Sequence, residues 1–295
     1  MSAALEAGVT PGRLRAQDLE VPFYGVRTPR TPATTSPKGR TDAAAEVRAA
    51  CHWLLPRLAA DHFFSHLTAA VLWGMPMPAN TWALPLHVSG IYPHRAPRTA
   101  NVVAHRLQIE PDQLIRRWGV LVPSPAETWA QLSTYLTADE LVMAGDSLIG
   151  RRGLATIEEL RAVSHRVRRT GIALLDAALE EMRSGSESAK ETETRLVLVR
   201  GGLPEPELNW VLHDDDGAVI ARLDMAYPRY RVGVEYDGRQ HAESIPQFAR
   251  DADRWHDLHV AGWTIVRVLA HHFDDPARLI LERTRSALTR NGWPG

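Results

Sequence analysis

The sequence is poor in cysteine and has no long apolar run. Cys51 is the only cysteine among 295 residues, which excludes intramolecular disulfides, cysteine-rich zinc sites and iron–sulfur clusters and fits a reducing compartment. No stretch approaches the roughly 20 apolar residues that span a bilayer, and residues 1–15 lack the apolar segment of a signal peptide. We therefore expect a soluble, cytoplasmic protein that does not associate with membranes.

Excess charge of either sign is also missing. The chain has 34 Lys and Arg residues against 35 Asp and Glu residues, which gives a formal net charge of −1. Any contact with nucleic acid must therefore be a local patch. Arginine carries nearly all of the positive charge, because Lys38 and Lys190 are the only lysines.

Three common motifs of nucleotide-binding and hydrolytic enzymes do not occur. The patterns GxxxxGK[ST], GxSxG and GxGxxG are missing, so nucleoside triphosphate hydrolysis, ordinary serine hydrolysis and dinucleotide binding have no support. What is present is a globular composition, 44% hydrophobic and 23% charged. The length suits two domains of about 100–200 residues each and a short arm.

Changes in composition divide the chain into regions. Ser124, Thr137 and Thr156 each precede a glutamate by three residues, a capping-box spacing that predicts three helix starts in the middle of the chain. The small, polar stretch 184–190 then separates this part from a differently patterned tail. In chain order we expect an arm, a mixed and mainly helical domain, and an α/β domain: residues 1–42, 43–183 and 184–295.

The tail alternates helical and strand patterns. Its expected elements are a helix, three strands, a helix, a strand and a helix: 191–200, 209–213, 219–226, 231–236, 246–260, 263–269 and 276–288. The order α, β, β, β, α, β, α predicts an α/β fold in which helices flank a mixed sheet. With the mainly helical domain before it, the chain is α+β overall.

Carboxylates gather at the ends of two expected strands. Asp224 ends the strand in RLDMAYP, and Glu235 and Asp237 end the strand in VGVEYDG. Because side chains alternate along a strand, Glu235 and Asp237 should share a face. Three acids at one sheet edge favour a divalent cation with oxygen ligands such as Mg²⁺, and Glu193 on the preceding helix is a further candidate. The alternative is that Asp224 and Asp237 serve as turn formers.

These residues resemble a known nuclease domain. Glu193-Thr-Arg-Leu, Asp224, and Val-Glu235-Tyr-Asp237-Gly followed by His241 are similar to the PD-(D/E)xK endonuclease superfamily, in its very-short-patch-repair branch. The order of elements in the tail is also that of the superfamily core, and the resemblance covers about the final third of the chain. It implies a restriction-endonuclease-like fold that binds DNA and hydrolyses phosphodiester bonds.

The resemblance implies roles for individual residues. Asp224 and Glu235 would hold Mg²⁺ or Mn²⁺, Glu193 would be an auxiliary acid on the helix, and His241 would transfer protons. The superfamily's usual lysine position holds Asp237, which departs from the pattern. For His241 the alternative is a surface histidine in a loop.

Basic residues suggest contacts with DNA phosphates. Arg250 and Arg254 lie four residues apart on one expected helix face, and Arg95 and Arg98 belong to a loop that mixes cations with an aromatic residue. Solvated ion pairing is the alternative for each of them.

The spacing of His62 and His66 is compatible with metal ligands, but the neighbouring apolar residues favour a packed helix.

The first two thirds of the chain resemble a different family. The segments SHLTAAVLWGMPMP, LHVSG, VPSPAETWAQL and ELVMAGDSLIGR are similar to AbiEi antitoxin-like proteins. The apolar segment PFYGVR, residues 22–27, has the pattern of a lone strand and resembles a remnant of their winged helix. This resemblance implies a cognate toxin or another protein partner. Two functions follow from the sequence: a metal-dependent DNA endonuclease or nuclease-fold DNA-binding protein, or a non-catalytic antitoxin-type regulator with a degenerate nuclease domain.

Overall fold

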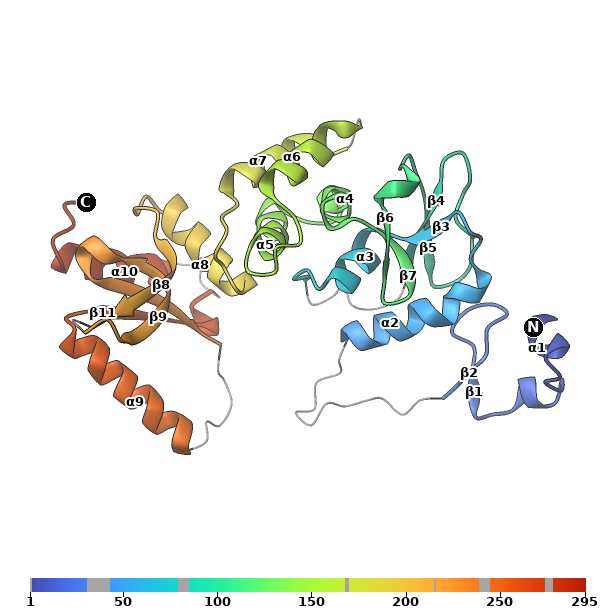
Figure 1. Cartoon of the computed structure of the whole chain (residues 1–295), viewed down its shortest axis with the longest axis horizontal. Coiled ribbons are helices and arrows are strands. Elements are labelled where there is room, and N and C mark those ends of the chain that lie inside the picture. The colour runs from blue at the N-terminus through green and yellow to red at the C-terminus, as the bar shows by residue number, and fades with distance from the viewer. Residues whose placement is uncertain are drawn as a thin grey trace. The chain divides into compact units, whose positions relative to one another are not determined.

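The chain has an α/β fold made of two compact units (Figure 1). The computed structural model describes residues 2–30, 43–78, 85–167, 170–214, 216–238, 245–273 and 278–295. Unit 1 comprises Met1–Ala144 and Leu154–Leu179, and unit 2 comprises Gly145–Gly153 and Glu180–Gly295. The second unit thus begins slightly before the boundary expected at residue 184 and also includes Gly145–Gly153.

Unit 1 mixes helices with two small sheets. In β3-β4-β5 the first pair of strands is antiparallel and the second parallel, and β6 and β7 form an antiparallel pair. The elements are α1 (Ser2–Glu6), β1 (Leu19–Glu20), β2 (Thr28–Pro29), α2 (Ala43–Leu54), β3 (His62–Phe64), α3 (His66–Trp73), β4 (Leu86–Ile91), β5 (Val102–Leu107), β6 (Leu114–Arg117), β7 (Val120–Pro123), α4 (Pro125–Gln131), α5 (Ala138–Ile149), α6 (Ile157–Arg166) and α7 (Ile172–Glu181).

The three capping boxes in the sequence mark real helix starts. The Ser124 hydroxyl accepts the Glu127 N–H at the start of α4, and Thr137 and Thr156 do the same for the glutamates of α5 and α6. Each bond satisfies a backbone donor that has no partner within the helix. Capping chemistry therefore sets these helix starts.

The arm departs from its expected structure. Residues 22–27, PFYGVR, do not form a strand but connect β1 and β2, which are antiparallel. Phe23 is buried, so the apolar residue that suggested a strand instead anchors this connection. The arm's residues 31–42, including Lys38, lie outside the described part of the chain.

Unit 2 is built around a four-stranded mixed sheet in the order β11-β10-β9-β8. Strands β8, β9 and β10 are antiparallel neighbours, and β10 and β11 are parallel. The elements agree with the order expected from the sequence: α8 (Ala189–Arg200), β8 (Glu207–His213), β9 (Val219–Tyr227), β10 (Val232–Asp237), α9 (Ile245–Val260), β11 (Thr264–Leu269) and α10 (Arg278–Arg290).

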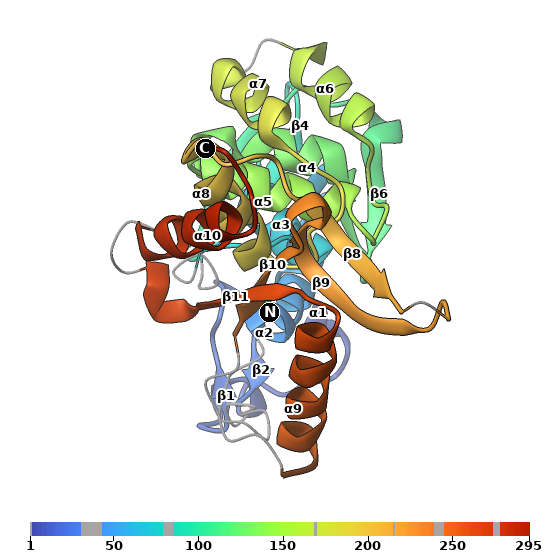
Figure 2. The ribbon, with the colours of Figure 1, turned by 90° about the vertical axis from the view of Figure 1, so that its left-hand side faces the viewer.

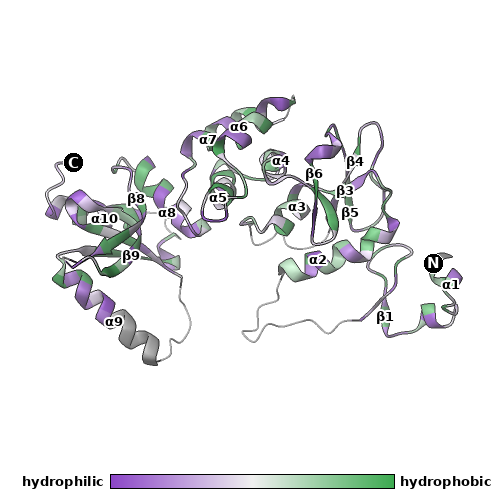
Figure 3. Cartoon of the chain, in the orientation of Figure 1, coloured by the Kyte–Doolittle hydropathy of each residue, from purple (hydrophilic) through white to green (hydrophobic). Residues whose placement is uncertain are grey.

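Helices cover both faces of this sheet (Figure 2). On one face, Val232, Val234 and Met225 pack with Leu198 of α8 and Ile280 of α10. On the other face a second core joins strand residues to α9, and its buried members are Ala221, Leu223, Ala226, Leu258 and Trp263. Many residues within β9 are therefore hydrophobic (Figure 3). Strand β7 of unit 1 is likewise rich in hydrophobic residues.

A buried ion pair ties the segment Gly145–Gly153 to α8. The Asp146 carboxylate accepts bonds from the Arg195 guanidinium at 2.9 Å, from the Thr192 hydroxyl at 2.9 Å and from the Arg183 N–H at 2.8 Å. Both side chains of the ion pair are almost fully buried, at 0% and 1% exposed. This pair explains why Gly145–Gly153 belongs to unit 2.

No helix in the described ranges is both long enough and apolar enough to cross a membrane.

Candidate functional site

Asp224 and Glu235, two of the acids predicted from the sequence, interact where two strands part. Strand β10 pairs with β9 as far as Val234 opposite Met225, whereas its pairing with β11 continues to Asp237. Just beyond that point, the Asp224 carboxylate accepts the Tyr236 backbone N–H at 2.9 Å. A side chain of β9 thus replaces the backbone partner that β10 has lost, and this brings the Asp224 carboxylate to the end of β10.

Alternation along β10 separates apolar from acidic side chains. Val234 and Tyr236 pack in the core beneath α8 and α10. Glu235 and Asp237 therefore face α9, and each carboxylate is paired with an arginine from that side. The shared face expected from the sequence is present.

Glu235 is buried and paired with Arg254. The guanidinium of Arg254 on α9 donates two bonds to the Glu235 carboxylate, one of them at 3.1 Å, and a further bond to the Arg222 carbonyl at 3.2 Å. An unpaired carboxylate at this depth would be costly. Arg254 is thus engaged in an ion pair within unit 2, which is the alternative to a phosphate contact.

Asp237 is paired with a different arginine. Its carboxylate accepts from the guanidinium of Arg267 on β11, and that guanidinium lies 4.9 Å from the centre of the Trp255 ring. Arg267 is therefore held between an acid and an aromatic face. The position that holds lysine in the superfamily carries here a carboxylate with an arginine counter-charge.

Burial and neighbouring negative charge raise the pKa values of two carboxyl groups at this site, Asp224 and Glu191. Burial raises the pKa of Asp224, and the Glu235 charge raises it further, while the Tyr236 N–H and the positive charges of Arg254 and Arg222 oppose these effects. Burial also raises the pKa of Glu191, with a contribution from the negative charge of Asp224. We call Glu191, Asp224, Glu235 and Asp237 the carboxylate cluster.

The negative charge of Asp224 acts on Glu191 of α8, whereas the expected helix acid Glu193 is paired with a lysine. Glu193 binds the Lys190 ammonium at 2.5 Å, and that ammonium also lies 4.1 Å from the centre of the Phe273 ring. Glu191 is held by the Ser188 hydroxyl and the Glu187 N–H. The spacing of Ser188 and Glu191, three residues apart at a helix start, is a capping pattern that predicts this hydrogen bond but no role at the site.

The cluster offers only oxygen ligands, which fit Mg²⁺ or Mn²⁺. Its mutual repulsion is also what a cation would relieve. Among the described residues, however, no three of its carboxylates lie within 4.8 Å of one another. His241 and the side chain of Arg250 lie outside the described part of the chain.

The loop residues proposed to contact DNA lie in unit 1. Arg95 and Arg98 are exposed, and Arg98 lines a hollow of about 360 Å³ together with Tyr24 and Arg57. Nearby in sequence, the Arg106 guanidinium lies 5.3 Å from the centre of the Tyr92 ring. This combination of arginine and exposed aromatic rings is typical of a surface that contacts nucleic acid.

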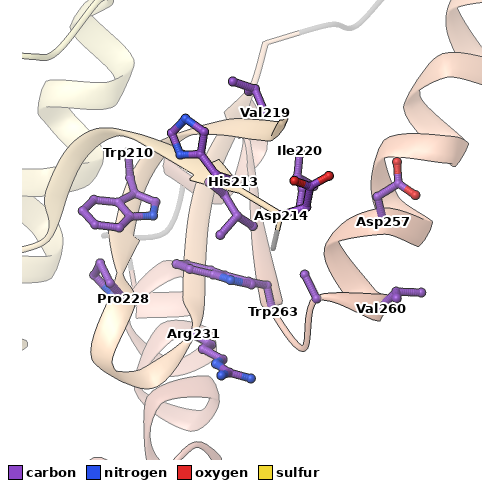
Figure 4. Close-up of a pocket in the computed structure, with 12 residues that line it drawn as sticks. Trp210, His213, Asp214, Val219, Ile220, Pro228, Arg231, Asp257, Val260 and Trp263 are labelled. Atoms are coloured by element: carbon purple, nitrogen blue, oxygen red, sulfur yellow. The ribbon is translucent and has the colours of Figure 1, made fainter. Parts of the chain in front are cut away.

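A groove of about 880 Å³ lies between the β8–β9 hairpin and α9 (Figure 4). The indoles of Trp210 and Trp263 line it, and Val219 and Val260 contribute apolar side chains that are largely exposed. The Asp214 carboxylate in this groove accepts backbone N–H groups of its own turn. The groove shares no residue with the carboxylate cluster.

Comparison with known proteins identifies relatives in mycobacteria. Two proteins of Mycobacterium tuberculosis, uncharacterized protein Rv2248 of strain H37Rv and uncharacterized protein MT2308 of strain CDC 1551, are each 32% identical to the chain over 227 residues. The match covers 75% of this chain and 81% of each relative. No protein-family model and no solved structure matches the chain. The chain belongs to the same family as these two mycobacterial proteins.

Proposed function

We propose that unit 2 acts on DNA as a metal-dependent endonuclease that hydrolyses phosphodiester bonds. The observation that carries this proposal is the carboxylate cluster, in which burial and neighbouring negative charge raise the pKa values of Asp224 and Glu191 at the parting of β9 and β10. Perturbed carboxylates at one strand end are typical of a functional site rather than of turn formation. The order of strands and helices supports the same proposal.

In this proposal Asp224 and Glu235 would hold Mg²⁺ or Mn²⁺, and Glu191 would take the role that the resemblance implies for Glu193. Such an ion supplies Lewis-acid polarisation of a phosphoryl oxygen and stabilises the negative charge that develops there. The Tyr236 N–H orients the Asp224 carboxylate toward the end of β10. His241, which follows β10 in the chain, remains the candidate for proton transfer.

The two arginines set the charge of the site. Arg254 neutralises Glu235, and Arg267 neutralises Asp237. A cation that binds Glu235 competes with Arg254, and a guanidinium released from Glu235 is free to contact a DNA phosphate. Arg254 would thus couple the binding of a cation at the carboxylate cluster to the binding of DNA.

Plasmid cleavage tests the proposal. Supercoiled, nicked and mismatched DNA should be cut by the full chain in Mg²⁺ or Mn²⁺ and left intact in EDTA. Glu235→Gln and Asp224→Asn should each abolish cleavage, and Glu235→Gln should bind DNA as tightly as wild type or more tightly, because a negative charge near phosphate is removed. Glu193→Gln is the matched control, since Glu193 is paired with Lys190 instead, and it should retain activity.

A second candidate function is a non-catalytic regulator of the antitoxin type. The observation that favours it is the pairing of both Glu235 and Asp237 with arginine. In addition, Lys190, which could otherwise replace the lysine missing at position 237, is paired with Glu193. If wild type cuts none of these substrates with either metal, yet binds a specific duplex or a protein partner, the regulator replaces the nuclease. Cleavage that survives Glu235→Gln would also reject the proposed site.

A further inference from the structure

Three histidines of unit 1 converge in a cluster separate from the carboxylates. His66 begins α3, His87 lies in β4 and His105 lies in β5, and a ring nitrogen from each lies within 4.8 Å of the others. The closest pair, His87 Nδ1 and His105 Nε2, is separated by 3.0 Å. The rings of His66 and His105 are stacked with centres 3.9 Å apart.

The sheet explains why these residues meet. The parallel register of β4 and β5 pairs Ser89 with His105, so His87, two residues earlier, shares the face of that pair. Strand β3 runs antiparallel to β4, and the Ser65 N–H that follows β3 donates to the His87 carbonyl at 3.0 Å. The next residue along the chain is His66.

His66 is held in a costly backbone conformation. Its φ of 48° lies in the left-handed region that residues other than glycine rarely adopt. The Gln131 side chain accepts its N–H at 3.0 Å, and its Nδ1 lies 2.9 Å from the Ser65 hydroxyl, which in turn accepts from Ser89. Strain of this kind is kept mainly at functional sites, where surrounding structure fixes a side chain in place.

We propose that His66, His87 and His105 together bind one divalent transition-metal ion of the zinc class. Ligand nitrogens sit about 2.0–2.1 Å from Zn²⁺, so two of them on a tetrahedral ion are about 3.3 Å apart. The separation of 3.0 Å between His87 and His105 is close to this value. Three imidazoles leave a fourth position open, as in zinc sites that bind water or substrate.

The surroundings supply what such a site needs. The Ser65 hydroxyl is placed to accept Nδ1–H from His66, which would leave Nε2 as the ligand. Gln131 connects the His66 backbone to the buried Glu127 carboxylate, a source of compensating negative charge. Tyr135 lies edge-on to all three rings and is 39% exposed, so the cluster is close to solvent on this side.

Nitrogen ligands distinguish this histidine cluster from the carboxylate cluster. Neutral imidazole favours Zn²⁺, Cu²⁺ or Ni²⁺, whereas carboxylates favour Mg²⁺ and Mn²⁺. The two sites should therefore bind different ions, and the histidine site does not depend on nuclease activity. Its failure would leave the proposed function untouched, and the reverse also holds.

Zinc titration of the full chain tests the histidine site. After removal of metals with EDTA and exchange into metal-free buffer, calorimetry should show one Zn²⁺ bound per chain in the presence of excess Mg²⁺. His105→Gln should weaken binding by about tenfold or more, while circular dichroism checks that it folds. His94→Gln is the matched control, because His94 is an exposed histidine of the same unit, with its side chain 68% exposed, and it should bind as wild type does.

Co²⁺ provides a spectroscopic readout of the ligands at the histidine site. Bound to wild type, it should give the intense visible absorption of a four-coordinate ion with nitrogen ligands and shift the NMR signals of three imidazoles. The double change Asp224→Asn, Glu235→Gln should leave this spectrum unaltered. A weak, six-coordinate spectrum, no Zn²⁺ binding by wild type, or equal binding by folded His105→Gln would each overturn the proposal.

Discussion

Unit 1 and unit 2 differ in how they accommodate buried polar side chains. The polar interior of unit 1 includes the imidazoles of His66 and His87, the hydroxyls of Ser65 and Ser89, and the Glu127 carboxylate, which accepts a hydrogen bond from the Gln131 amide. Burial lowers the pKa of His87 to about 4, and the positive charge of His105 adds to this effect, so His87 is neutral near pH 7. Unit 2 buries two ion pairs, Asp146–Arg195 and Glu235–Arg254.

This difference bears on both stability and function. Neutral groups are satisfied by hydrogen bonds at moderate cost, whereas each buried charge needs an opposite charge beside it. Arg195, the partner of Asp146, is fully enclosed within the unit. Arg254, the partner of Glu235, extends from α9 and is only partly buried. A pair near the surface is easier to exchange for a cation than a fully enclosed one, which suits the carboxylate cluster to metal binding.

The largest expected effect concerns the enclosed pair. Arg195→Met should lower the free energy of unfolding of unit 2 by about 3–5 kcal/mol, because it leaves the Asp146 charge buried without its partner. Arg200→Met is the control, since Arg200 forms a surface pair with Glu181 and should cost at most about 1 kcal/mol. Urea denaturation followed by hydrogen exchange in peptides of unit 2 measures both values; equal losses would contradict the assigned role of Asp146.

Zinc should stabilise unit 1 selectively. At a free Zn²⁺ concentration of about 100 times the Kd, binding to the folded state adds about 2.7 kcal/mol to its stability. Hydrogen exchange should therefore slow in peptides that contain His66, His87 and His105 and stay unchanged in β10. Slowing confined to β10 would place the ion in the other unit.

Removing an acid from the carboxylate cluster should stabilise unit 2. The pKa of Asp224 is raised in the folded state, so protonation favours folding, and that stability is lost as the pH rises through the folded pKa. Asp224→Asn should therefore raise the stability of unit 2 at pH 7 by about 1 kcal/mol. The gain should shrink as the pH falls below the folded pKa, because wild type then also carries a neutral side chain. A gain independent of pH would contradict the electrostatic explanation.

The smallest expected effect concerns the basic surface of unit 1. The double change Arg95→Ala, Arg98→Ala should weaken DNA binding uniformly across sequences and reduce the slope of log K against log salt by about 2. Fluorescence anisotropy at several salt concentrations measures this slope. His94→Gln provides a control in the same loop. An unchanged slope would mean that these two arginines do not contact phosphates.

Much of the fold could be predicted because its signals are local. The N-cap residues of α4, α5 and α6 and the strand patterns of unit 2 depend on residues a few positions apart, and the structure confirms them. The expected strand at residues 22–27 is wrong, because these residues connect β1 to β2 and bury Phe23 there despite its β-propensity. Propensity alone could not reveal that packing.

The site was predictable only in part. Alternation along β10 places Glu235 and Asp237 on one face, as expected, but the choice between Glu191 and Glu193 depends on how α8 is rotated against β9. The arginine partners come from α9 and β11, which lie 19 and 30 residues further along the chain. The histidine cluster joins residues through the register of β4 and β5, and no local sequence pattern encodes that register.

The central claim is that Asp224 and Glu235 hold the divalent ion of unit 2. Calorimetric titration with Mg²⁺, an ion that imidazole ligands bind poorly, tests this claim most directly when wild type, Glu193→Gln and the double change Asp224→Asn, Glu235→Gln are compared. Wild type and Glu193→Gln should bind Mg²⁺, and the double variant should not. Equal Mg²⁺ binding by all three proteins would contradict the account and place the metal elsewhere.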